Sequence, residues 1–382
     1  MLPTVNSANQ WMKCNGSVLA QELHPGTPGE LSESKLEGRA CHEVAQKIIA
    51  VFRNEPDTPL FSDLVGSLSK DGVLITQELF EAAREYVNDV LKYCRENGLT
   101  EALQVEQRVG LSKYLPEWYG IPDAVVYNPL ENTLVIWDAK FGHRLVEAFE
   151  NWPMLIYAMG KVEDLGLNNQ TLITLRVVQP RGFHSGGIIR EWSLSRAELF
   201  IYETQLTQGL NSVRNPTPPT AVGPQCLDCS ARANCDTLSR VNYDNIDYMR
   251  DLSTHTLTGH SLGVELKLLR RAKKMLEYRL SGLEEQAIHE IKSGKNVSFF
   301  GAQAGKGREL WKKDVPTDQV IMMGDLMGVD IRKPVELDTP SQVRKKGISE
   351  EVIAQYSETP TTGLKLVERD EKSVKLIFDK TC

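Results

Sequence analysis

The sequence lacks the features of a membrane or secreted protein. None of its apolar runs approaches the roughly 20 residues that cross a bilayer, and its start has no basic region followed by an apolar stretch, as a signal peptide has. These absences predict a cytoplasmic protein without a membrane partner. An excess of positive charge is also lacking, because the formal net charge of the 382 residues is -7. Any contact with nucleic acid therefore has to come from a local patch.

Internal repeats and low-complexity tracts are absent as well. Hydrophobic residues make up 41% and charged residues 25% of the chain, which is ordinary usage for a globular protein. The length predicts two domains. A proline-rich loop over residues 214 to 225 and a change of character beyond residue 240 put the domains at 1–240 and 241–382.

The apolar spacing alternates between the helical period and the strand period. Helix, three strands, helix and strand in succession predict an α/β fold with a mixed central sheet flanked by helices, followed by a mainly helical C-terminal region. Helices are predicted over residues 35–53, 76–97, 144–162 and 264–294, and strands near 103–111, 120–128, 132–141, 171–179 and 373–378.

Two strand-like stretches carry charges where a buried strand should have none. Alternate residues of a strand share a face, so Asp138 and Lys140 project together, and a neighbouring strand or turn can bring Asp123 beside them. Two carboxylates a few ångströms apart repel unless a cation lies between them. Oxygen ligands favour Mg²⁺ or Mn²⁺, and a lysine beside that ion could orient a water for attack on a phosphodiester.

Three of the seven cysteines fall within ten residues, in the stretch QCLDCSARANC. This C-x2-C-x5-C spacing offers three ligands for one metal group: Cys226, Cys229 and Cys235. Cys14, in an irregular segment, is the natural fourth ligand, since two other cysteines lie within predicted helices and another is the last residue. Structural Zn²⁺, an iron–sulfur cluster and unliganded packing remain open on the spacing alone.

The stretches PDAVV and VIWDAK resemble the PD-(D/E)XK nuclease motif of lambda exonuclease, RecB-type nucleases and many restriction enzymes. The resemblance implies a restriction-endonuclease-like core and a catalytic Mg²⁺ or Mn²⁺ held by Asp123, Asp138 and the backbone carbonyl of Ala139. GRACH resembles the RecB-like Gly-x-x-x-His pattern, which makes His42 a further metal ligand. Glu106, in QVEQRV, corresponds to an acidic residue that assists the metal or the water.

The helix after the lysine in this superfamily carries Gln-x-x-x-Tyr. Here Tyr157 matches the tyrosine, whereas Pro153 stands where the glutamine belongs. Asn151 is the candidate to replace it, and Tyr157 is expected to flank the substrate or pack in the core.

One cysteine before the nuclease core and three after it resemble the AddB-type and CRISPR-adaptation nucleases, in which a [4Fe–4S] cluster ties the two ends of the domain together. The sequence from residue 7 to about residue 240 is similar to a phage and prophage family of RecB-like nucleases. That resemblance implies an exonuclease that processes DNA ends, single- or double-stranded, during replication and recombination in a bacterial host. A single-strand-binding or recombinase protein and a homo-oligomer are the partners it suggests.

The long C-terminal helix carries a cluster of basic side chains: Arg270, Arg271, Lys273 and Lys274. They form either a solvated face or a rail for the phosphate backbone. Two other functions compete with the nuclease. One is a DNA-binding scaffold whose nuclease site has decayed, which Pro153 would explain, and the other is a zinc-stabilised RNA-processing factor.

Overall fold

The computed structural model describes residues 2–25, 33–53, 55, 61–184, 186–250 and 259–302, together with residues 322 and 326. One compact unit spans Met1–Gln303 and a second spans Ala304–Cys382. The strand predicted over residues 373–378 lies outside the described residues. The domain boundary predicted at residue 240 falls within helix α8 (Asp236–Arg250).

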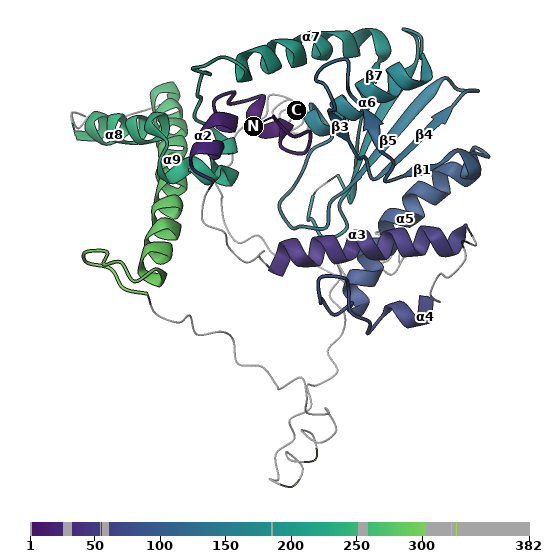
Figure 1. Cartoon of the computed structure of the whole chain (residues 1–382), viewed down its shortest axis with the longest axis horizontal. Coiled ribbons are helices and arrows are strands. Elements are labelled where there is room, and N and C mark those ends of the chain that lie inside the picture. Colours follow the sequence, from purple (N-terminus) through teal and green to yellow (C-terminus); the bar gives the residue numbers. More distant parts are fainter. Residues whose placement is uncertain are drawn as a thin grey trace, which may run out of the picture. The chain divides into compact units, whose positions relative to one another are not determined.

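A five-stranded mixed sheet, in the order β1-β4-β5-β6-β7, organises the first unit (Figure 1). β5 and β6 are parallel, and the other neighbouring pairs are antiparallel. β2 and β3 form a separate two-stranded sheet. The strands are β1 (Gln104–Val105), β2 (Val109–Gly110), β3 (Tyr119–Gly120), β4 (Ala124–Asn128), β5 (Thr133–Ala139), β6 (Leu172–Val178) and β7 (Ile189–Ser195). The predicted α/β class with a mixed sheet flanked by helices is confirmed, whereas β7 was not predicted.

The helices cover the sheet on both sides and continue beyond it (Figure 1). Their bounds are α1 (Ala8–Trp11), α2 (Ser17–Leu23), α3 (Glu33–Phe52), α4 (Phe61–Leu64), α5 (Gln77–Glu96), α6 (Trp152–Leu165), α7 (Arg196–Val213), α8 (Asp236–Arg250) and α9 (Gly259–Lys292), with short 3-10 turns at Thr100–Ala102, Pro224–Asp228 (η2) and Ser230–Ala233 (η3). α9 packs against α8 and against η3, so the C-terminal part of the first unit is helical, as predicted.

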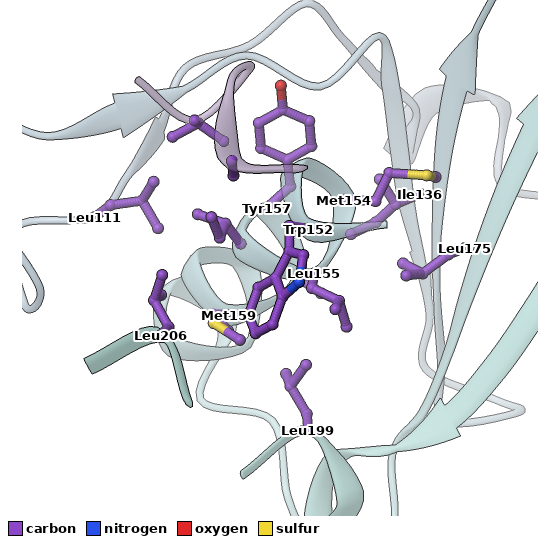
Figure 2. Packing of buried hydrophobic residues seen from close by; sticks show 14 of the residues in the cluster. Leu111, Ile136, Trp152, Met154, Leu155, Tyr157, Met159, Leu175, Leu199 and Leu206 are labelled. Atoms are coloured by element: carbon purple, nitrogen blue, oxygen red, sulfur yellow. The ribbon is translucent and has the colours of Figure 1, made fainter. Parts of the chain in front are cut away.

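Strand β5 is buried on both faces and divides two hydrophobic cores. Leu134 and Ile136 pack with α6 and α7, and Val135 and Trp137 pack on the opposite face with α3 and α5. Figure 2 shows the first of these cores around the side chains of α6. Side chains that alternate between two cores fix the register of the strand, since a slip of one residue would exchange its faces. The position of the charged residues at the end of β5 is therefore tightly determined.

Helix α5 ends as the sequence predicts. The side chain of Thr76 accepts a hydrogen bond from the backbone N–H of Leu79, and Gly98 adopts a left-handed conformation (φ 68°) directly after the C-cap.

The helix predicted over residues 144–162 is wrong in its first half. Helix α6 begins only at Trp152, with Pro153 in its first turn, where a missing N–H costs no helical hydrogen bond. Residues 142–151 instead form an irregular segment that borders the candidate site, described below.

Candidate metal centre and cleft

Asp123 and Asp138 meet because β4 and β5 pair in antiparallel register. Ala124 lies opposite Trp137, so the residue before β4 comes beside the end of β5. The backbone N–H of Ala139 donates a hydrogen bond to Asp123 Oδ2 at 2.6 Å. This hydrogen bond fixes one carboxylate oxygen and leaves Oδ1 for another partner.

Three potential metal ligands converge at that free oxygen. One ligand atom each from His42, Glu106 and Asp123 lie within 4.8 Å of one another. His42 comes from α3, and its Nδ1 lies 3.6 Å from Asp123 Oδ1. A nitrogen and two carboxylates at this spacing can ligate one divalent cation.

Glu106 is held in place by its backbone. It directly follows β1, and its N–H donates to the carbonyl oxygen of Asp123 at 3.1 Å. Its φ angle is 47°, a left-handed conformation that is uncommon outside glycine and is found preferentially at functional sites.

Asp138 and Lys140 form an ion pair beside this group, with Lys140 Nζ 2.7 Å from Asp138 Oδ1. Burial lowers the pKa of Lys140, but Asp138 and Asp123 together raise it above its ordinary value. Lys140 is therefore an ammonium in the metal-free protein. It can orient a water or stabilise negative charge on a phosphate, but it does not act as a base in this state.

Asp123 is the carboxylate of the site whose charged form is disfavoured. Burial raises its pKa from 3.8 to about 6; His42 and Lys140 oppose the rise and Asp138 adds to it. A cation at this position would relieve both the desolvation and the repulsion between the two carboxylates.

Gln179 holds the segment that follows β5. Its fully buried amide donates to the carbonyl oxygens of Gly142 and Arg144, at 2.6 and 2.8 Å, and its Oε1 accepts from the N–H of Val146 and from Arg190. These hydrogen bonds fix the path of the chain just beyond Lys140.

A cleft of about 720 Å³ opens from Asp138 and Lys140. Its walls come from the N-terminal segment, the segment 142–151, the start of α6, η2 and Tyr278 of α9. Asn151, which was expected to replace the missing glutamine, lines this cleft at 3% exposure, and its buried Oδ1 has no hydrogen-bond partner. Such an unpaired acceptor is costly unless something binds to it.

The four predicted cysteine ligands line one small cavity of about 20 Å³, namely Cys14, Cys226, Cys229 and Cys235. Backbone contacts join their segments, since the N–H of Gly16 donates to the carbonyl of Pro219 and the N–H of Ala221 donates to Cys14 Sγ. Burial raises the pKa of the Cys14, Cys226 and Cys229 thiols, the last to about 11. Without a metal these thiols are neutral.

The remaining predicted site residues lie outside the cluster of potential metal ligands. Tyr157 is 4% exposed and packs in the α6 core, with its hydroxyl donating to Asn6 Oδ1 at 2.8 Å. The basic residues of α9, Arg270, Arg271, Lys273 and Lys274, are exposed and do not line the cleft. Cys41 and Cys94, the two cysteines within predicted helices, are fully buried in the α3–α5 core.

Sequence reasoning missed the N-terminal wall of the cleft, which includes Asn6 and Asn9, and the role of Gln179. Asn9 Oδ1 accepts the N–H of Trp152 at the start of α6, a contact between residues 143 positions apart. The stretches NSANQW and VVQPRG contain these residues, but nothing in their composition indicates a long-range contact.

The fold and the site together define an α/β protein with a cluster of acidic and histidine side chains at the edge of a mixed sheet, and four cysteines at a second position. The chain belongs to the DUF2800 family, whose model, described as a protein of unknown function, matches residues 4–373. No curated protein matches the sequence. Within the described part of the chain, no helix combines the length and apolar character needed to cross a membrane.

Proposed function

We propose that this protein is a Mg²⁺- or Mn²⁺-dependent deoxyribonuclease that hydrolyses phosphodiesters at DNA ends. The observation that carries the proposal is the convergence of His42, Glu106 and Asp123 within 4.8 Å, directly beside the Asp138–Lys140 ion pair. This arrangement combines oxygen and imidazole ligands with a fixed ammonium, which suits the activation of a water and the neutralisation of a developing phosphate charge.

In this proposal Asp123, Asp138, His42 and the Ala139 carbonyl bind the catalytic ion, and Glu106 supports a second ion or a water. When bound, the ion lowers the pKa of its water and so supplies the nucleophile. Lys140 positions that water and stabilises the charge on the phosphate. The resemblance to phage nucleases supports an exonuclease that acts in the cytoplasm of a bacterial host, with a single-strand-binding or recombinase protein or a second copy of the chain as partner.

We further propose that the four cysteines hold a [4Fe–4S] cluster rather than zinc. All four side chains line one cavity. One cysteine before the sheet and three after it is the arrangement that resembles the iron–sulfur nucleases. Its role is architectural, because it joins segments before and after the sheet and so constrains the unfolded chain.

Cleavage of end-labelled single- and double-stranded DNA in Mn²⁺ tests the proposal. We expect wild-type protein to degrade DNA, EDTA to stop the reaction, and Asp123→Asn and Lys140→Ala to abolish it while circular dichroism shows a retained fold. Glu85→Gln, which alters an exposed carboxylate on α5, is the matched control and should cut normally. Binding without cleavage by the wild type would instead identify a DNA-binding scaffold, and cleavage of RNA alone an RNA-processing factor.

A further inference from the structure

Phe149 presents a large apolar side chain in the catalytic cleft. In the segment that follows Lys140, Ala148 is buried in the α6 core, whereas Phe149 is 60% exposed and lines the cleft together with Asp138 and Lys140. Single exposed aromatic residues are common on protein surfaces. This one lies in the same cleft as the proposed reacting centre.

A series of aromatic contacts supports the ring from behind. The Phe149 ring packs edge-to-face on Trp192 of β7 at 5.0 Å, Trp192 on Tyr202 of α7 at 5.7 Å, and Tyr202 on the buried Trp152 of α6 at 5.9 Å. Such contacts hold rings in defined orientations. The Phe149 ring is thus packed against the Trp192 ring on one side and exposed on the other.

The backbone beside Phe149 is strained in a way that keeps this geometry. Glu150 adopts a left-handed conformation with φ 51°, and its Oε1 accepts a long hydrogen bond, 3.5 Å, from the hydroxyl of Tyr202. A non-glycine residue in this conformation costs about 1 kcal/mol or more. The strained turn at Glu150 directs Phe149 outward, and Asn151, the residue after Glu150, is buried again.

The charges of the cleft do not suit a ligand that is recognised by its phosphates alone. Among the described residues that line the cleft, three are cationic and four are carboxylates. One of the cations, Arg144, is also paired with Asp228 through two contacts of 2.8 and 3.0 Å. Binding that depends on phosphate charge needs a cationic groove, so another source of affinity is required here.

We propose that Phe149 is a base-stacking subsite, which holds an unpaired nucleobase next to the phosphate that is cleaved. The inference rests on the proposed nuclease function and adds to it a residue that selects unpaired strands. Stacking on an aromatic side chain contributes about 1 to 3 kcal/mol per base and does not depend on sequence. The faces of bases inside a duplex are covered by their neighbours.

A measurement of DNA binding in a variant that does not cleave DNA tests this subsite. In an Asp138→Asn background, the full chain is titrated into fluorescein-labelled (dT)12 and into a blunt duplex of the same length, with fluorescence anisotropy as the readout. Phe149→Ala should weaken binding of (dT)12 about 5- to 100-fold, as 1 to 3 kcal/mol implies, and change duplex binding less than about twofold. Phe149→Tyr, which keeps the ring, should bind (dT)12 as the parent does.

Phe183→Ala is the matched control, since Phe183 is 89% exposed but does not line the cleft. A 2-aminopurine placed in the oligonucleotide should be quenched by the parent and by Phe149→Tyr but not by Phe149→Ala. Unchanged (dT)12 binding by Phe149→Ala, or an equal loss for single strand and duplex, would overturn the subsite. If wild type cuts DNA while Phe149→Ala binds (dT)12 normally, the subsite is refuted and the nuclease function is not. If (dT)12 binding depends on Phe149 but wild type does not cut DNA, the nuclease function is refuted and the subsite is not.

Discussion

Asp123→Asn is expected to stabilise the metal-free protein while it removes metal binding and cleavage. In the folded chain the pKa of Asp123 rises from 3.8 to about 6, mainly because the carboxylate is buried. At pH 8 that rise corresponds to about 3 kcal/mol of destabilisation, at 1.36 kcal/mol for each pH unit. Asparagine has no charge to desolvate and can still accept the hydrogen bond from the Ala139 N–H. We therefore expect a gain in the free energy of unfolding of about 1 to 3 kcal/mol.

The sign of the pH dependence follows from the same shift. Because the native pKa of Asp123 lies above its unfolded value, the native state binds more protons between about pH 4 and pH 6. The stability contributed by this group is present below about pH 4 and is lost as the pH rises through about 6. The advantage of the asparagine variant should accordingly be large at pH 8 and vanish near pH 4.

Urea unfolding in EDTA, followed by far-ultraviolet circular dichroism, measures both effects. Wild type, Asp123→Asn and the control Glu85→Gln are compared at pH 4, 6 and 8. Saturating Mn²⁺ at pH 8 should reverse the order, because an ion that binds the native state stabilises wild type alone. A variant that is less stable than wild type in EDTA at pH 8 would refute the reasoning, as would a difference that does not change with pH.

Two further predictions concern the surroundings of the site. Cys229→Ser should reduce the bound iron and acid-labile sulfide and lower the melting temperature. The control Cys94→Ala, which alters a thiol outside the cysteine cavity, should keep its metal. Equal metal content in both variants would contradict the assignment. Gln179→Leu leaves the Gly142 and Arg144 carbonyls without their partner and should cost about 2 to 4 kcal/mol of stability. It should also lower kcat more than tenfold without loss of Mn²⁺ affinity, and an unchanged kcat would show that the segment needs no such support.

Much of the fold follows from local pattern. The alternation through β5 separates two cores as the sequence predicts, and the helices at α3, α5 and α9 begin and end close to the predicted residues. The segment 144–151 has helical spacing but does not form a helix. Gln179 and Arg190 form hydrogen bonds with its backbone, and Pro153 can start a helix after it without losing a hydrogen bond. β7 alternates between buried and partly exposed residues, a weak pattern that only its pairing with β6 makes clear.

Only part of the candidate site could be predicted from the sequence. The order of His42, Glu106, Asp123 and Asp138 along the chain, read through a family resemblance, predicts candidate site residues that the structure brings together or places side by side. The walls of the cleft could not be predicted from the sequence, because they depend on how loops pack together in the folded chain. In the sequence, Phe149 fits the apolar spacing of a helix. Only the folded structure shows that its ring lies in the cleft.

The cysteine cavity has a consequence for how the protein is made. Cys14 precedes every strand of the sheet and Cys235 follows every one of them. During synthesis this donor set is incomplete until the ribosome has made every strand of the sheet. A polypeptide that ends before Cys235 would therefore lack a donor for any group that the four cysteines bind together.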